Sequence, residues 1–185
     1  MVRERTLETA MKKIDPKEIR DNAMQLIGHD WMLVTAGTPE HFNMMTASWG
    51  GLGVLWNKPM ATIYVRPQRY TFQFLEESDR FTLSFFSPQW RKQLAHCGAV
   101  SGREEDKFAA CGFHVADADG APYVQEADLV LVCKKRYWND LGPGPHGPRG
   151  PGALPGPGLP PDVPGGDYPS PASGLILSRN KGGPS

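Results

Sequence analysis

Short apolar runs separated by turn residues dominate the first 141 positions of the chain. Residues 31–36 and 129–133 are continuous apolar stretches, a pattern typical of strands buried on both faces. Residues 60–66 instead alternate between apolar and polar side chains, which predicts a strand with one buried face that ends at Pro67. The same reasoning predicts further strands over residues 42–49 and 81–86.

The helical segments are predicted to be few and short. Asp15 followed by Pro16 marks a helix start, since Asp caps a helix and Pro fits its first turn. Apolar residues recur at helical spacing over residues 70–77 and 90–97, and residues 117–120 predict the turn of a hairpin. Many strands with only short helices between them favour a mainly β fold, a barrel or sandwich, over a doubly wound sheet.

Composition changes sharply near Leu141. Residues 142–185 hold 12 of the 18 prolines and 12 of the 21 glycines, with almost no large apolar side chains. Such a segment cannot bury enough apolar surface to offset its conformational entropy. We therefore expect a folded domain over residues 12–141, a polar extension over residues 1–11 and a disordered C-terminal tail over residues 142–185.

Charge and cysteine content narrow the class of protein. Lys plus Arg and Asp plus Glu are equal at 20 each, which gives no electrostatic reason to expect nucleic acid or a membrane surface as partner. No stretch approaches the roughly 20 apolar residues that span a bilayer, and the charged N-terminus does not look like a secretory signal. Three cysteines in 185 residues suit a reducing cytoplasm, so a cytoplasmic location is expected.

Two sequence patterns resemble known functional sites but do not meet the requirements of those sites. Residues 51–56 resemble the start of a dinucleotide fingerprint, but Trp56 stands where that motif needs a small residue, and no helix is expected to follow. His96, Cys97, Cys111 and His114 are zinc-ligand types, but the first two are directly adjacent and so rarely reach one ion. No metal site and no acid–base or nucleophilic site is predicted, and ordinary buried cysteines are the favoured interpretation.

Three polar segments instead point to a phosphate-bearing ligand. Residues 43–50 place small hydroxyl residues and glycines where a ligand can approach the backbone. Residues 65–71 bring two arginines, a phenol and a hydroxyl to a strand-to-helix junction, and arginine with a helix N-terminus suits phosphate. Residues 101–108 supply a third set of hydroxyl, glycine and cation. Any one of them could be an ordinary polar loop, but three on one small domain favour such a ligand.

At these residues the chain resembles the flavin reductase-like, FMN-binding split-barrel family, particularly its flavoredoxin-type members. The resemblance covers residues 12–141 and is specific because the matching motifs are long and in order. They are residues 13–16, 30–33, 45–51, 55–59, 65–71 and 81–86, with Cys97-Gly98 and Ser101-Gly102-Arg103.

The resemblance implies a six-stranded antiparallel split barrel with short helices, a homodimer that binds one FMN per subunit near its interface. In that reading the segment from Thr46 to Trp49 lines the flavin and its phosphate, and the junction before the second helix holds the phosphate and ribityl chain. The cofactor-binding residues it implies are Thr46, Ala47, Ser48, Trp49, Val65, Arg66, Arg69, Tyr70, Thr71, Ser101, Gly102 and Lys107.

The family implies redox chemistry carried by the flavin, for which the protein supplies orientation and electrostatics. The leading interpretation is an NAD(P)H-dependent flavin reductase, with NADH or NADPH as electron donor. A second is a flavoredoxin-type electron carrier that holds FMN tightly and takes electrons from a redox protein partner. Both need the same flavin pocket, so the sequence does not separate them.

The C-terminal region departs from the family pattern. Asp167-Tyr168 matches it, but Pro169 and Pro171 follow where a closing strand is expected, and proline breaks a strand ladder. A frameshift could produce this Pro-Ser-Pro, so an inactive product of a damaged gene is a third hypothesis. The sequence then predicts that a closing strand is missing.

Overall fold

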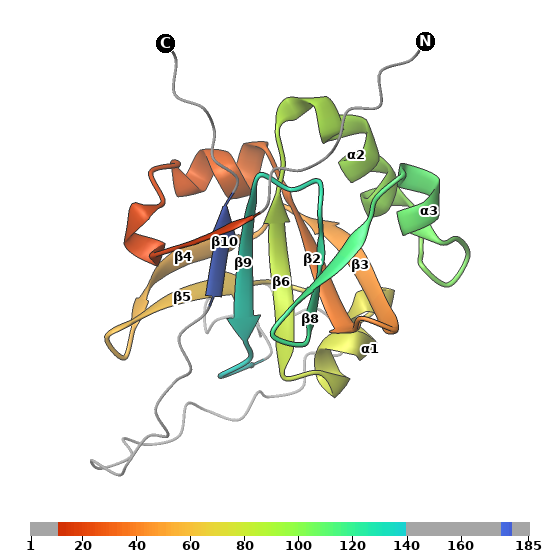
Figure 1. Ribbon diagram of the computed structural model, residues 1–185. Helices are drawn as coiled ribbons and strands as arrows, with labels where there is room; N and C mark the ends of the chain where they lie inside the picture. The colour runs from red at the N-terminus through yellow and green to blue at the C-terminus, as the bar shows by residue number, and fades with distance from the viewer. Residues whose placement is uncertain (1–10, 140–174, 179–185) are drawn as a thin grey trace, which may run out of the picture. The chain divides into compact units, whose positions relative to one another are not determined.

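The computed structural model describes residues 11–139 and 175–178, and its core is an antiparallel β-sheet. Six strands lie in the order β1-β10-β9-β6-β2-β3. Figure 1 shows β9, β6, β2 and β3 side by side at the centre of the fold. The six strands are β1 (Lys12–Ile14), β2 (Met32–Thr38), β3 (His41–Ala47), β6 (Arg80–Phe85), β9 (Leu129–Lys134) and β10 (Leu175–Ser178).

Both faces of this sheet are covered, which explains the continuous apolar runs. On β2, Met32 and Val34 belong to one buried cluster, whereas Leu33 belongs to the other. The same alternation on β9 sends Leu131 to the first cluster and Val130 to the second. A strand with an apolar layer on each side loses the polar positions of a half-buried strand, so the expectation of strands over residues 31–36 and 129–133 is confirmed.

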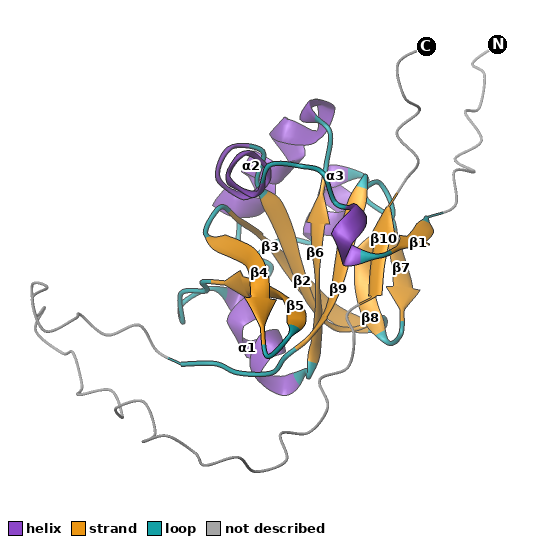
Figure 2. Cartoon of the chain, turned by 90° about the vertical axis from the view of Figure 1, so that its left-hand side faces the viewer, coloured by secondary structure: helices purple, strands orange, loops and turns teal. Residues whose placement is uncertain are grey.

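Two hairpins and several short helices form these covering layers (Figure 2). The first cluster includes Phe74 and Leu75 of α1, with Leu52 and Ile63 of the β4–β5 hairpin packed against it. The second includes Leu94 of α2 and residues of the β7–β8 hairpin. These elements are β4 (Gly50–Leu55), β5 (Lys58–Ile63), α1 (Tyr70–Glu77), α2 (Arg91–Ala99), α3 (Lys107–Cys111), β7 (Val115–Ala118) and β8 (Ala121–Val124).

Residues with a left-handed backbone form the turns of both hairpins. Asp119 and Gly120 have φ of 54° and 76° between β7 and β8, as a two-residue turn of this kind requires. The β4–β5 hairpin was not anticipated, although its two turn residues, Trp56 and Asn57, also have positive φ. The glycine-rich residues before that turn are therefore a strand and not a dinucleotide loop.

Single helical turns complete the described chain. Asp15 caps the 3₁₀ turn Pro16–Glu18 and accepts from the Lys17 N–H at 2.8 Å, while the Glu18 side chain reaches back, so the expected start is confirmed. A π-helical turn spans Gln25–His29, and another 3₁₀ turn, Pro88–Trp90, leads into α2. No helix in the described residues is long and apolar enough to cross a bilayer.

The C-terminal strand corrects one expectation. The backbone of Leu175–Ser178 pairs antiparallel with β9 on one side and with β1 on the other. Residues 175–178 thus belong to the sheet as a strand, which the sequence did not predict. The remainder of the expected tail, including Pro169 and Pro171, lies outside the described residues, as do most of the residues 1–11 that were expected to form an extension.

Candidate functional site

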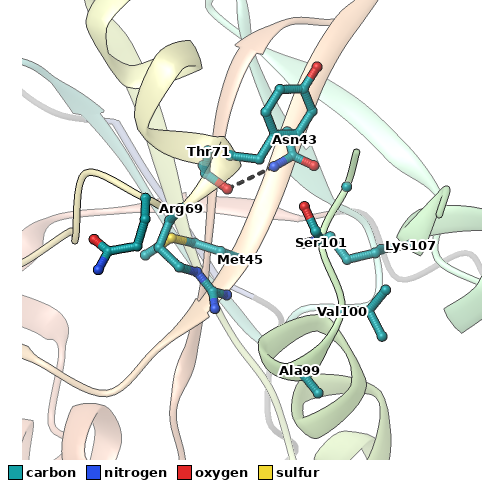
Figure 3. A pocket seen from close by; sticks show the side chains of 11 residues that line it. Asn43, Met45, Arg69, Thr71, Ala99, Val100, Ser101 and Lys107 are labelled. Atoms are coloured by element: carbon teal, nitrogen blue, oxygen red, sulfur yellow. Dashed lines mark hydrogen bonds between the residues drawn. The ribbon is translucent and has the colours of Figure 1, made fainter. Parts of the chain in front are cut away.

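A cavity of about 110 Å³ opens where β3, the start of α1 and the loop between α2 and α3 meet (Figure 3). Arg69 lies on one side of it in this view, with Ser101 and Lys107 on the other. Among the described residues no carboxylate lines this cavity. Its lining consists of Asn43, Met45, Gln68, Arg69, Tyr70, Thr71, Ala99, Val100, Ser101, Gly102 and Lys107.

Lys107 brings a buried positive charge to the cavity. Its side chain is 4% exposed, and its ammonium group donates to the backbone oxygens of Met44 and Cys97. These carbonyls use two of the three N–H groups, and within the described part of the chain the third has no partner. Burial lowers the pKa of Lys107, because a charged amine loses hydration that neutral carbonyls replace only in part.

Arg69 brings a second positive charge, at the residue that precedes α1. Its Nη1 donates to the carbonyl of Gly98 at 3.0 Å, which fixes the guanidinium against the end of α2. Burial lowers the pKa of Arg69, and the nearby charge of Arg66 lowers it further. Two cations held by neutral carbonyl groups, in a cavity whose described lining contains no carboxylate, form a site complementary to an anion.

The N-terminus of α1 adds backbone donors to the same cavity. No side chain caps this helix at Arg69, and Tyr70 and Thr71, its first two residues, line the cavity. The first N–H groups of a helix lack intrahelical partners and favour an anion. The cavity therefore combines a helix N-terminus with two cationic side chains.

A buried amide orients the hydroxyl group at the helix start. Asn43 on β3 donates from Nδ2 to the Thr71 hydroxyl oxygen at 2.9 Å, a bond drawn in Figure 3. Because that oxygen accepts from the amide, the hydroxyl proton is left to donate to a ligand. Gly102 packs against the same amide so closely that an added Cβ would lie 2.1 Å from Asn43 Oδ1. A side chain at position 102 would therefore collide with the Asn43 amide.

Half of the twelve site residues proposed from the sequence line this cavity. They are Arg69, Tyr70, Thr71, Ser101, Gly102 and Lys107. Asn43, Met45, Gln68, Ala99 and Val100 also line it. The first three fall within the predicted segments 43–50 and 65–71 but were given no individual role, whereas Ala99 and Val100 lie outside the predicted segments.

The other six proposed residues lie elsewhere, and contact of any of the twelve with a flavin stays a prediction. The Thr46 hydroxyl donates to the Leu94 carbonyl at 2.5 Å, so it serves the packing of α2 on β3. Ala47 belongs to the first core cluster, and Val65 packs against it. Ser48 is half-buried, whereas Trp49 and Arg66 are exposed.

The His and Cys side chains considered for zinc are separated into pairs. His96 pairs with Glu105 at 3.0 Å, and His114 pairs with the buried Glu126 at 2.7 Å. Cys97 lies beside Cys111 instead, with 3.6 Å between their sulfur atoms. Within residues 11–139 no group of three such side chains is arranged to hold a metal ion.

Comparison with known sequences identifies the family. The flavin reductase like domain matches residues 24–138, more than half of the chain. The protein therefore belongs to the flavin reductase-like family, as the sequence motifs indicated. No curated protein matches the chain in a sequence comparison.

Solved structures share its fold at low sequence identity. The flavoredoxin of Desulfovibrio vulgaris (Miyazaki F) is 22% identical with a TM-score of 0.54, over 81% of this chain and 66% of that one. An FMN-binding domain of a flavin reductases-like enzyme from Shewanella baltica is 22% identical with a TM-score of 0.57, over 68% and 65%. The NADH:FAD oxidoreductase of Streptomyces globisporus is 18% identical with a TM-score of 0.51, over 81% and 71%. This chain spans just under two thirds of the length of the first two proteins.

Proposed function

We propose that this protein binds FMN, with the flavin phosphate in the cavity between β3, α1 and α3. The observation that carries this proposal is the pair of cations, Arg69 and Lys107, in a cavity that no carboxylate lines among the described residues. A phosphate monoester carries close to two negative charges at neutral pH and accepts several hydrogen bonds. The uncapped start of α1 and the hydroxyl groups of Thr71 and Ser101 supply donors for it.

The size of the cavity fits part of the cofactor. Sites that enclose a whole drug-sized ligand measure roughly 300–1,000 Å³, whereas this cavity measures about 110 Å³. It therefore suits the phosphate end, and the isoalloxazine ring is proposed to lie outside it, against the predicted segment from Thr46 to Trp49. When bound, FMN supplies the capacity to accept a hydride and pass on electrons. The residues of the cavity bind and orient it.

The proposed activity is NAD(P)H-dependent reduction of flavin. Membership of the flavin reductase-like family supports this activity. Among the described residues that line the cavity, Lys107 and Arg69 are bonded to carbonyl groups and are not paired with a base. They are suited to binding charge and not to proton transfer, in keeping with chemistry that belongs to the cofactor.

The proposed assembly is a homodimer that associates through the β4–β5 hairpin. Trp49 is 58% exposed, Val54 76% and Trp56 48%, and all three lie on or beside this hairpin. Several large apolar side chains left exposed on one hairpin are typical of a contact site. A second copy of the chain is proposed to cover them and to complete the flavin site that one subunit only begins.

Oxidation of NADH and NADPH by the purified protein, with and without added FMN, tests the activity. A flavin reductase oxidises at least one of the two dinucleotides faster when FMN is present. Retention of FMN through desalting, without oxidation of either dinucleotide, would indicate the flavoredoxin-type electron carrier instead. Absence of FMN binding in a folded protein would overturn the proposal.

A further inference from the structure

Two thiol groups meet where α2 packs against α3, beside the cavity. The sulfur atoms of Cys97 on α2 and Cys111 on α3 are 3.6 Å apart, and both cysteines are free. A disulfide needs a separation of about 2.05 Å, so the thiols need to close by about 1.5 Å. Fourteen positions along the chain separate the pair, and the fold alone brings them into contact.

The two thiols differ in their access to solvent. Cys111 is half-buried and lines a second cavity of about 290 Å³, together with His96 and Glu105. Cys97 is fully buried, and burial raises its pKa to about 12. Burial also raises the pKa of Cys111. Both groups are therefore thiols at neutral pH, and Cys111 is the one that a small solute reaches.

The third cysteine lies on the other side of the sheet. Cys133 packs against the first core cluster, whereas Cys97 belongs to the second. Its thiol contacts the Leu131 carbonyl at 3.7 Å, within its own strand. The sheet thus separates Cys133 from both members of the pair.

We propose that Cys97 and Cys111 form an oxidation site at which a peroxide converts the two thiols into an intrachain disulfide. The Cys111 sulfur, after losing its proton, attacks one oxygen of hydrogen peroxide; the O–O bond breaks, and hydroxide leaves and is protonated to water. The Cys97 sulfur then attacks the resulting sulfenic acid; the S–O bond breaks, and water leaves with the Cys97 proton. Two thiols lose two electrons and two protons, and one peroxide becomes two waters. The proton that Cys111 loses is the one that converts the leaving hydroxide into water.

The disulfide would act on the proposed phosphate site through Lys107. Lys107 and Cys111 are four residues apart on α3 and so share a face of that helix. The Lys107 ammonium also donates to the carbonyl of Cys97 itself, at 3.4 Å. Drawing the two sulfur atoms together therefore shifts the residues that hold this charge. We expect FMN affinity to fall by about tenfold on oxidation, the cost of one charge-assisted contact; this consequence rests on the proposed function, whereas the disulfide does not.

Peptide mapping of the unaltered protein tests the oxidation site without any flavin. After peroxide treatment and blocking of free thiols, cleavage after Lys, Arg and Glu places Cys97, Cys111 and Cys133 in three separate peptides, residues 93–103, 108–126 and 127–134. The expected product joins the first two peptides and falls apart on reduction. Sulfinic or sulfonic acid on Cys111 without that product, or a link to Cys133, would overturn the proposal. The variant Cys111→Ser is the matched control and should yield no intrachain link.

FMN titration of the reduced, oxidised and re-reduced protein tests the coupling. Weaker binding that recovers on re-reduction supports it, and Cys111→Ser should show no change after peroxide. Equal affinity in all three states would overturn the coupling while leaving the mapped disulfide in place. A reduced protein that binds no FMN but forms the disulfide would overturn the proposed function and leave the oxidation site standing.

Discussion

Asn43 holds the hydroxyl group of Thr71 by an amide hydrogen bond of 2.9 Å that joins β3 to the first turn of α1. Both side chains are buried, and both line the cavity between Arg69 and Lys107. The direction of this hydrogen bond determines which group can donate to a ligand. The amide N–H donates a hydrogen bond to the threonine oxygen, so the threonine hydroxyl group is left to donate a hydrogen bond to a ligand.

Asn43→Asp is expected to weaken FMN binding by about tenfold or more, and riboflavin binding far less. The carboxylate cannot donate to Thr71, and it places a negative charge beside the proposed phosphate. Flavin fluorescence titration with the two ligands measures the difference. Asn22→Asp is the control, because the exposed Asn22 only accepts from the N–H groups of Met24 and Gln25, as Asp does equally well. Equal losses for both ligands would show that Asn43 acts on the fold and not on the phosphate.

The two arginines of the same junction are expected to differ. Arg69 lines the cavity, while Arg66 is exposed and does not. Arg69→Ala should weaken FMN relative to riboflavin by about 1.5–3 kcal/mol, the range for a hydrogen bond to a charged group. Arg66→Ala should have a smaller effect through long-range charge. A larger loss for Arg66→Ala would place the phosphate outside the cavity, nearer the site that the sequence resemblance implies.

Gly102→Ala is expected to disturb the site through Asn43. The added methyl group would lie 2.1 Å from Asn43 Oδ1, so the amide has to move and release Thr71. We expect FMN affinity to drop and the free energy of unfolding to fall by about 1–3 kcal/mol, the usual cost of overpacking. Gly53→Ala is the matched control, since nothing lies within 4 Å of an added Cβ there. Urea denaturation and FMN titration of both variants provide the comparison.

FMN affinity is expected to decline as the pH rises. The decline should begin at a lower pH than it would for a lysine with the ordinary pKa of 10.5. Burial lowers the pKa of Lys107, so the free protein loses this charge below that pH. Lys107→Arg should keep its charge and show a flatter profile. The stability of the flavin-free protein should change in the opposite direction. Between the folded pKa of Lys107 and 10.5 the unfolded state binds more protons than the folded state, so the free energy of unfolding rises with pH. Identical binding profiles for the two proteins would exclude Lys107 as the titrating group.

Val54→Asp is expected to convert a dimer into a monomer. Val54 is 76% exposed on β4, where a carboxylate costs little in one subunit but would be buried without a partner in the proposed interface. Light scattering after size-exclusion chromatography gives the mass. Gln73→Asp, exposed on α1 and not on the hairpin, is the control for an added surface charge. A wild-type protein that is monomeric at high concentration would contradict the proposed assembly.

The pattern of apolar residues was sufficient to predict the strands whose side chains are buried in a regular way. The strands that contain Leu33 and Leu131 were predictable because their apolar runs fit a two-faced sheet, and Asp119-Gly120 is a strong turn signal. Strand β5 was predicted in part, from the alternation over residues 60–66, but β4 was missed because its exposed apolar residues, such as Val54, give no core-facing alternation. The helix α3 was missed because it has only five residues, although Asp106 caps its start and Gly112 ends it in a left-handed conformation.

The cavity was predictable only in its charged and hydroxyl residues. Arg69, Thr71 and Lys107 carry cationic or hydroxyl groups, which can be recognised in the sequence as donors to phosphate. Met45 and Val100 line the same space because a strand and a loop distant in sequence meet there, and no local pattern encodes that meeting. The sequence resemblance put Arg66 first, with Arg69, as the residue that holds the phosphate. In the structure a turn links them, from the Arg69 N–H to the Arg66 carbonyl at 3.0 Å, and only Arg69 lines the cavity.

The strand β10 also sets the order in which the molecule can assemble. Among the strands that the structure describes, β1 pairs with β10 alone, so the first described strand is attached to the sheet through the last. A nascent chain can pair β2, β3, β6 and β9 before residues 175–178 leave the ribosome, but β1 has no place to dock until then. The N-terminal strand is therefore expected to join the fold last. A protein shortened just before Leu175 should lose hydrogen-exchange protection at Lys12–Ile14 while β2 and β6 keep theirs.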